Sequence, residues 1–423
     1  MRHSNSKIAR MLTVMAISGL MPSSTFSQAQ ETKPKLDFSG FGRTYAGVLY
    51  SNGDLTILQN TLDLTLKYRR KKVGFAANAF YYQYPYQQDF FGIRELYMDI
   101  FTKKVDLRIG KQQIVWGQAD GVFITDIVSP LNLTEFLLWD FNEIRMGVTA
   151  IKAKFYPHQN HNFELVYIPV FMPTLAPAVG TIWRPQLETP FPPTFDRSKE
   201  TVPLNVQSGE VFGRYTLSTS AIDLQLMGAY TWDDNPSLHI NMLIDTATMQ
   251  PNVVLISPQH HRVAMGGGNF SADIKGFILR GEAAYYNGRY FQTTDPTATD
   301  ALVKKDMMNY VVGLDKSIGT WKLSTQFIQK VIFDRDELMT EEALDNLITV
   351  LVVKTLFREK VRLELFSYIG LNNPDAFVRF RVFYFPYDGV SLELGTNMFF
   401  GTKGTFGQYG ANDMGYMRVK YSF

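Results

Sequence analysis

Cysteine is absent from this sequence of 423 residues, which excludes a disulfide scaffold and any metal site built on cysteine. An excess of one charge is also missing, because 42 Lys and Arg stand against 40 Asp and Glu. Nucleic-acid proteins need a basic surface, so we expect no nucleic-acid partner. Long apolar runs are missing as well, the longest uncharged one beyond the N-terminus being 347–353. Helical transmembrane topology is therefore excluded.

The first thirty residues have the composition of an export signal. Three basic residues among the first ten precede an apolar run at 11–21, and Ser27 and Ala29 are the small residues of a cleavage site. We expect residues 1–29 to be a cleaved signal peptide and 30–36 a short periplasmic segment. An N-terminal membrane anchor is the alternative, but the run is shorter than the roughly 20 apolar residues that a spanning helix needs.

Apolar and polar residues alternate with a period of two through most of the remaining chain. Residues 222–232 are the clearest example, and 62–68, 378–384 and 417–423 repeat the pattern. A strand with one apolar and one polar face alternates in this way. Segments of about ten residues with this pattern are typical of a transmembrane β-barrel, whose outer face meets lipid while its inner face meets the lumen.

The segments between these strands fall into two length classes that alternate along the chain. Eight short turns are predicted at 70–72, 102–104, 157–161, 218–220, 275–276, 318–320, 358–360 and 387–389, and nine mostly longer loops separate them. Eight turns and nine loops require eighteen strands, with both termini on the short-turn side. We therefore predict an all-β fold, an antiparallel barrel spanning 37–423. Sixteen strands remain possible, and a weak strand can hide within 233–260.

Aromatic residues gather near the predicted strand ends, where amphipathic rings favour the lipid headgroup level. Tyr68, Tyr230, Trp232 and Phe423 are examples. A soluble β-sandwich or propeller is the alternative fold, but such folds rarely end in an alternating strand with a terminal Phe. The C-terminal Phe423 resembles the signal by which Gram-negative outer-membrane proteins are handed to the barrel assembly machinery. We expect that machinery and outer-membrane lipid as partners, and the outer membrane of a Gram-negative bacterium as the location.

The most distinctive stretch, 110–147, contains a long loop at 117–147 that combines apolar residues with acids. Such an apolar loop is unlikely to lie in water, and irregular backbone is tolerated at membrane depth when protein surrounds it. We therefore expect the loop to fold into the barrel, either as a plug that braces the wall or as a constriction that sizes the solute. The expected anchoring residues are Asp120, Asp126, Asp140 and Glu143 in the loop, with Arg94, Arg108 and Arg145 as bases.

The same stretch carries a resemblance to a known family. Its residues Gly110, Gln112, Trp116, Gly117, Asp120, Asp126, Ser129, Pro130, Leu133, Asp140 and Arg145 resemble a segment that recurs in large, poorly characterised bacterial outer-membrane barrels related to porins. More distantly, the whole chain resembles eighteen-stranded channels of the alginate-export type. The resemblance implies a monomeric outer-membrane channel and names no substrate.

Assigning the polar face of each strand to the lumen predicts a basic wall. The wall residues are Lys67, Arg280, Arg362, Arg379, Arg381 and Arg418, against fewer acids. The loop acids reduce this excess, so we expect at most a weak anion preference. Alternatively, the charges pair across strands and only keep the lumen wet. The proline-rich loop 171–209 is expected to be an extracellular lid or, alternatively, a surface that binds a sugar or an apolar ligand through exposed rings.

Three functions stay open on this basis. The first is a channel for small solutes, the second a plugged barrel with a structural role, and the third a transporter that releases hydrophobic compounds laterally. Enzyme activity is not expected, and neither is a cofactor or a metal. Hydrolytic barrels need a nucleophile with a base, usually a His with an acidic partner. The pair His260 and His261, near acids at 233, 234 and 245, reads more simply as solvated loop residues.

Overall fold

The computed structural model describes residues 35–185, 191, 193–244 and 251–423. The predicted signal peptide and nearly all of the predicted periplasmic segment lie outside these residues. The first strand, β1, begins at Lys35, two residues before the predicted start of the barrel. Among the described residues, no helix is long and apolar enough to cross a membrane.

Eighteen strands form one antiparallel sheet, as predicted from the alternating turns and loops. They are β1 (Lys35–Leu49), β2 (Leu55–Arg70), β3 (Val73–Gln83), β4 (Phe90–Phe101), β5 (Val105–Gln112), β6 (Val148–His158), β7 (His161–Ile168), β9 (Glu210–Ser218), β10 (Ile222–Trp232), β13 (Arg262–Ile274), β14 (Phe277–Gln292), β15 (Leu302–Ile318), β16 (Trp321–Ile332), β17 (Leu344–Leu356), β18 (Val361–Gly370), β19 (Ala376–Tyr384), β20 (Val390–Phe400) and β21 (Met414–Ser422). The eight short turns lie where the sequence places them.

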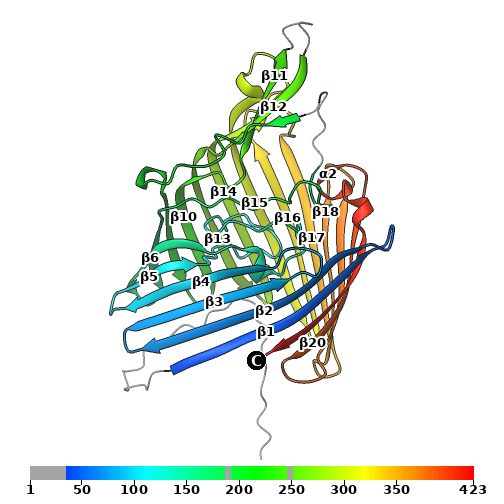
Figure 1. Cartoon of the computed structure of the whole chain (residues 1–423). Coiled ribbons are helices and arrows are strands. Elements are labelled where there is room, and N and C mark those ends of the chain that lie inside the picture. The colour runs from blue at the N-terminus through cyan, green and yellow to red at the C-terminus, as the bar shows by residue number, and fades with distance from the viewer. Residues whose placement is uncertain (1–34, 186–190, 192, 245–250) are drawn as a thin grey trace, which may run out of the picture.

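The sheet closes on itself, because β1 pairs with β2 along one edge and with β21 along the other. At the closure Arg43 stands opposite Lys420 and Tyr45 opposite Arg418, and the backbones of Gly40 and Phe423 exchange two hydrogen bonds. Figure 1 shows the strands tilted across the barrel, with the C-terminus at the end that carries the short turns. Closure leaves no unpaired edge in the barrel, so every strand has two neighbours.

Alternation along each strand separates an outer apolar face from an inner, mostly polar face. In β10, for example, Leu226 is 52% exposed whereas its neighbour Met227 is 8% exposed. In β2, Leu62 points outward while Thr61 and Asp63 are buried on the inner side. The burial pattern therefore follows the period of two seen in the sequence, and large apolar side chains surround the barrel on its outside.

A second, small sheet lies beyond the barrel at the loop end. It consists of β11 (Ser237–Ile244), β12 (Pro251–Gln259) and the short β8 (Pro193–Phe195), which pairs in parallel with β12. Figure 1 shows this sheet projecting above the loop end. Two strands thus occupy the predicted 233–260 loop, but neither joins the barrel. The remaining elements are single turns: α1 (Phe141–Ile144), α2 (Gly404–Gly407), η1 (Val206–Ser208), η2 (Thr299–Ala301) and η3 (Gly410–Asn412).

Candidate functional site

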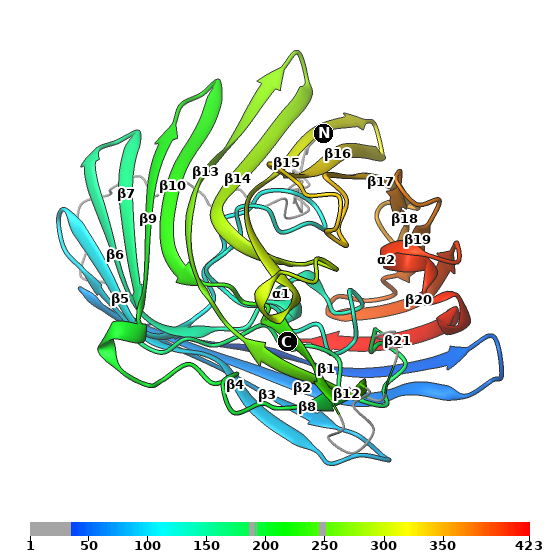
Figure 2. The same ribbon diagram turned by 90° about the horizontal axis from the view of Figure 1, so that it is seen from above.

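Residues 113–147, between β5 and β6, lie inside the barrel, and we call them the internal segment. Figure 2 shows α1 and its adjoining coil within the ring of strands. Side chains that point inward from strands all round the ring bond to this segment. They are Arg43 of β1, Glu164 of β7, Asn269 of β13, Arg280 and Glu282 of β14, Gln326 of β16, Tyr368 of β18, Arg379 of β19 and Arg418 of β21.

Glu282 holds the first half of the internal segment. Its carboxylate accepts hydrogen bonds from the backbone N–H of Gln118, of Ala119 at 2.6 Å and of Thr125 at 3.1 Å, and from the Thr125 hydroxyl at 2.8 Å. Glu282 is only 4% exposed. A carboxylate that collects several N–H donors in a dry site makes hydrogen bonds about twice as strong as neutral ones. The wall therefore supplies the acid here and the segment supplies the donors, the reverse of the polarity predicted for this loop.

Arg280 holds the same half of the internal segment, and here the wall supplies the base and the segment supplies the acid, as the sequence predicts. Its guanidinium donates to Asp120 Oδ2 and to the Gln118 carbonyl, both at 2.7 Å. It also pairs with Asp315 on the neighbouring strand at 2.6 Å. Asp120 is thus anchored to the wall, but by Arg280 rather than by one of the bases expected to anchor the loop.

The second half of the internal segment is held beside α1 by two arginines. Arg43 Nη1 lies 2.9 Å from Glu143 Oε2 and 3.1 Å from Asp140 Oδ2, and Arg418 Nη1 lies 2.7 Å from Asp140 Oδ1. Arg94 Nη2 is 4.0 Å from Glu143. The side chains of Arg43 and Glu143 are 3% and 7% exposed. Removing one partner of such a buried pair typically costs about 3 to 5 kcal/mol, so these contacts fix the segment firmly.

Two acids in this half have displaced pKa values. The partly enclosed position of Asp140 would by itself raise its pKa, but Arg418 and Arg43 outweigh that desolvation and hold its pKa below the ordinary value. Burial raises the pKa of Glu135 to about 7, and Arg418 and Arg43 oppose the rise only in part. Asp140 is therefore a fixed negative charge at neutral pH, whereas Glu135 titrates there.

Asp126 and Arg145 have a role different from the predicted one. Arg145 Nε bonds Asp126 Oδ2, and Asp126 also accepts from the backbone N–H of Trp116 at 3.0 Å. The side chains of Asp126 and Arg145 are 1% and 3% exposed. Arg145 was predicted to serve as a base of the wall, but it belongs to the internal segment itself, so the pair closes the segment on itself. Arg145 also lies 3.7 Å over the Phe141 ring.

Arg108 does not contact the internal segment, contrary to the prediction. It makes two hydrogen bonds to Asp99 on the adjacent strand, at 2.7 and 3.0 Å. The reason is register, because Asp99 and Arg108 stand directly opposite each other in β4 and β5. A cross-strand partner at that spacing satisfies the guanidinium before any loop can reach it.

Glycines allow the internal segment to approach the wall. Gly121 has a φ of +77°, and a Cβ there would lie 2.7 Å from the Tyr368 hydroxyl, which donates to the Gly121 carbonyl. A Cβ on Gly147 would lie 2.1 Å from the Arg94 carbonyl oxygen. Any larger residue at these two positions would push the segment away from the strands.

One side of the lumen is filled by an apolar core. Ile114, Trp116, Ala119, Ile124 and Val128 of the internal segment pack there. Their partners on the wall are Val148, Ala150, Val166, Ile168, Phe212, Met227, Met265, Ala284, Val311 and Ile328, from β6 round to β16. Trp116 is 1% exposed and donates through Nε1 to Glu164 at 2.7 Å. Because this packing is dry and dense, water and solutes are excluded from this side.

The opposite side of the lumen is partly apolar and partly charged. Its wall consists of β1, β2 and β18 to β21. Toward the loop end of these strands, Leu138 of the internal segment packs in a second apolar core with Tyr368, Phe377, Phe399, Met414 and Tyr416. Five of the six predicted wall bases face the lumen from the same strands, and we call this charged part the charged sector: Lys67, Arg362, Arg379, Arg381 and Arg418. Arg381 pairs with Glu364 and lies 3.8 Å from Glu393. The Asp140 side chain, which projects from the internal segment toward this sector, remains 39% exposed. A carboxylate inside a barrel can be this exposed only if lumen water reaches it.

Several contact residues were missed from the sequence. Arg43 lies in a glycine-rich strand with a weak alternating pattern, so its face was hard to assign. Glu164 was detectable, since it alternates with outward Phe163 and Leu165. Arg94, by contrast, was among the bases expected to anchor the loop, and it lies at a register shift between β3 and β4 at Asn78 and Ala79.

The described part of the chain between β7 and β9 (169–185, 191 and 193–209) reaches the opposite side of the mouth at Trp183, and we call it the strap. Its Trp183 is 4% exposed and packs on Phe136, Phe399 and Tyr409. Tyr409 Oη donates to the Trp183 carbonyl at 3.1 Å. The strap thus connects the β7 side of the mouth to the loop before β21.

His260 and His261 are not the solvated loop residues that the sequence suggests, because His260 is only 8% exposed and packs on Phe171, and His261 packs on Tyr290. His239 bonds Asp300 through Nδ1 at 2.8 Å and His261 through Nε2 at 2.9 Å, while His260 bonds the Asp233 carbonyl. No group of three or more His, Asp or Glu in the described part of the chain could hold a metal ion.

A closed barrel of eighteen strands with loops folded into its bore has the fold of outer-membrane porins. Acinetobacter baumannii OccAB4 shares it with a TM-score of 0.54 at 10% identity, over 95% of this chain and 99% of that one. Pseudomonas aeruginosa OccK8 (OprE) gives 0.55 at 8% identity, over 92% and 98%, and Pseudomonas aeruginosa OccK5 (OpdH) gives 0.53 at 9%, over 92% and 98%. At these identities the likeness concerns the fold alone.

The chain belongs to the family described as protein of unknown function (DUF1302), whose model matches residues 50–350. No curated protein matches the sequence. A family of unknown function and a porin fold together agree with the resemblance to poorly characterised porin-like barrels, while the more distant resemblance to alginate-export channels stays an expectation.

Proposed function

We propose that this protein is a channel in the outer membrane of a Gram-negative bacterium that passes small solutes. The observation that carries the proposal is a closed barrel with an apolar outside and a charged lumen, narrowed by an internal segment bound to the wall. In this arrangement the short turns face the periplasm and the long loops face outward. The expected cleaved signal peptide, monomeric state and use of the barrel assembly machinery belong to the same proposal.

The route for solutes passes through the charged sector. The apolar core closes the side from β6 to β16, because no water can enter dense apolar packing there. The charged sector keeps polar groups on both of its sides: Arg418 and Arg381 on the wall, and Asp140 on the internal segment. The narrowest point then lies between α1 and the strands β1 and β21.

Charges along this route cancel in part. Arg381 pairs with Glu364 and Arg418 with Asp140. Four further bases of the same wall have no ion-pair partner among the described residues: Lys67, Arg362, Arg379 and Lys420. A strong anion filter needs a one-sided ring of bases at the constriction, so we expect a weak anion preference. Reversal potentials across a salt gradient measure it, and strong cation selectivity would show that Asp140 and Glu143 control passage instead.

A plugged barrel with a structural role is the second candidate. The observation that favours it is the internal segment itself, which bonds to strands from β1 round to β21 and packs a dry core against half of the wall. In this case the charges near α1 act as a brace, and the protein does not conduct ions.

Recordings in planar bilayers separate the two candidates. The refolded protein should give discrete current steps if it is a channel, and none if it is a plug. Asp140→Asn removes the carboxylate shared by Arg43 and Arg418, so the α1 side should loosen and the conductance should rise. Asp223→Asn is the matched control, because Asp223 faces the lumen from β10 and has no ion-pair partner in the described part of the chain. Folded protein that never conducts, even as Asp140→Asn, would reject the channel.

A further inference from the structure

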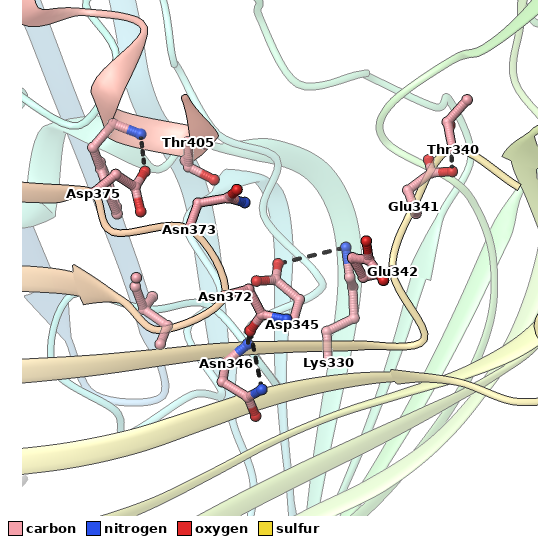
Figure 3. Close-up of a pocket in the computed structure, with 14 residues that line it drawn as sticks. Lys330, Thr340, Glu341, Glu342, Asp345, Asn346, Asn372, Asn373, Asp375 and Thr405 are labelled. Atoms are coloured by element: carbon pink, nitrogen blue, oxygen red, sulfur yellow. Dashed lines mark hydrogen bonds and ion pairs between the residues drawn. The ribbon is translucent and has the colours of Figure 1, made fainter. Parts of the chain in front are cut away.

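A polar cavity of about 250 Å³ lies at the loop end of the barrel, outside the contacts of the internal segment with the wall. Figure 3 shows its lining side chains converging from β16, β17 and the loops beside α2. Lys330 follows the inward positions of β16, and Asp345 those of β17, so the cavity lies toward the lumen. Its polar lining consists of Lys330, Thr340, Glu341, Glu342, Asp345, Asn346, Asn372, Asn373, Asp375 and Thr405.

Part of this lining is already hydrogen-bonded and part is free. Asn346 donates twice to Asn372 Oδ1, at 2.8 and 3.0 Å, and Thr340 donates to Glu341 at 2.9 Å. By contrast, the carboxylate of Glu342, the amide of Asn373 and the hydroxyl of Thr405 have no hydrogen-bond partner among the described residues. The cavity therefore has a fixed amide frame and several unoccupied acceptors.

The charges around the cavity are unbalanced. Four carboxylates, of Glu341, Glu342, Asp345 and Asp375, face one ammonium group, that of Lys330. The single ion pair is loose, with Lys330 Nζ 3.6 Å from Asp345 Oδ2. Positive charge is therefore in deficit there.

Asp375 makes the deficit sharper, because it is only 6% exposed. Its Oδ2 accepts the backbone N–H of Phe406 at 2.7 Å, yet no Lys, Arg or His among the described residues pairs with it. Buried carboxylates are normally paired with a positive group or neutralised, because burying a lone charge is costly. A cationic guest in the cavity would supply the missing charge.

The arrangement of the lining suits an organic molecule better than a metal ion. Among the described residues no three acidic or His side chains converge closely enough to hold a metal, so these carboxylates surround a volume instead of a point. A space of about 250 Å³ holds several water molecules, and therefore also a small molecule with separated donors. Carboxylate and amide oxygens at separate places match the N–H donors of an amine.

We propose that this cavity binds small organic cations that carry amine groups, as a recognition site at the loop end of the lumen. The proposal names a solute class for the channel and in that respect rests on the proposed function. Binding itself needs only the folded barrel. A bound amine would replace the cavity water, donate to the free carboxylates and compensate the buried Asp375.

Calorimetry on the refolded barrel in detergent tests the binding, with spermidine as the probe. Spermidine should bind in low salt, and the neutral diol 1,4-butanediol should not. Glu342→Gln removes an exposed carboxylate and should weaken spermidine binding about threefold to fivefold. Asp375→Asn keeps an acceptor for Phe406 N–H and should weaken it about tenfold or more, because its charge is buried.

Glu337→Gln is the matched control, since Glu337 is an exposed acid of the same 333–343 loop that does not line the cavity. If this variant weakens binding as much as Glu342→Gln, diffuse surface charge attracts the probe and the site is rejected. Mg²⁺ that competes with spermidine at equal concentration would also reject an organic-cation site.

Planar-bilayer recordings then distinguish the two proposals. Spermidine added on the loop side should cause brief current blocks, with fewer in Glu342→Gln. A barrel that conducts but does not bind spermidine overturns the cavity assignment and leaves the channel intact. A folded barrel that binds spermidine but does not conduct overturns the channel and leaves the cavity assignment standing.

Discussion

Replacing Glu282 with Gln probes how the wall holds the internal segment. The carboxylate accepts four hydrogen bonds from the segment, three of them from backbone N–H groups. In the amide, one oxygen becomes an NH₂ group, so about two of these donors face another donor. Each buried unsatisfied donor costs about 1 to 3 kcal/mol, which gives roughly 2 to 6 kcal/mol for the loss of docking. The equilibrium ratio of docked to undocked segment should then fall by a factor of about 30 to 20,000.

The absence of cysteine makes this change measurable by labelling. Val122, which packs against the apolar core, can be replaced by Cys in an otherwise thiol-free chain. In this background Glu282→Gln should accelerate modification by a maleimide, because the partly buried thiol becomes more accessible when the segment leaves the wall. Asp223→Asn removes the same charge from the lumen wall, at a position where no described residue forms an ion pair with it, and it should leave the rate unchanged. Equal rates for the two variants would refute the argument that Glu282 anchors the segment.

Three further predictions follow from contacts elsewhere in the barrel. Deleting Phe423 removes the two backbone bonds to Gly40 and the ring contact with Phe38 at 5.7 Å, so insertion should fall, as measured by the heat-modifiable fraction in outer membranes. Burial raises the pKa of Glu135 to about 7, so the contribution of this group to docking of the internal segment should be largest below about pH 4.5 and be lost as the pH rises through 7. Maleimide labelling of Val122→Cys should therefore speed up over this pH range. Glu135→Gln should abolish the pH dependence. Trp183→Ala should destabilise the packing of the strap against the barrel by about 3 to 5 kcal/mol and speed proteolysis within 169–209. An unchanged rate of proteolysis would mean that Trp183 does not hold the strap.

Much of the fold follows from local chemistry, and for that reason the sequence determines it. A strand that separates lipid from lumen must alternate, so Leu62 and Leu226 lie outside while Asp63 and Met227 lie inside. The turns are short because antiparallel neighbours need few residues between them, so their positions and the count of eighteen strands follow from spacing. The apolar run with acids at 117–147 likewise indicates burial inside the barrel, because its side chains cannot remain in water.

The partners of the internal segment were decided only by the tertiary structure. Arg108 pairs with Asp99 because strand register places them opposite each other, and Arg145 turns back onto Asp126 because the segment folds on itself. Glu282 and Arg43 are 239 positions apart in the sequence, yet closure and stagger of the barrel bring both to the same segment. Periodicity assigns a residue to one face of its strand. The position of that residue along the barrel axis and around the ring depends on how all eighteen strands close. That closure, which no local pattern encodes, is what sets the dry core on one side of the lumen and the charged sector on the other.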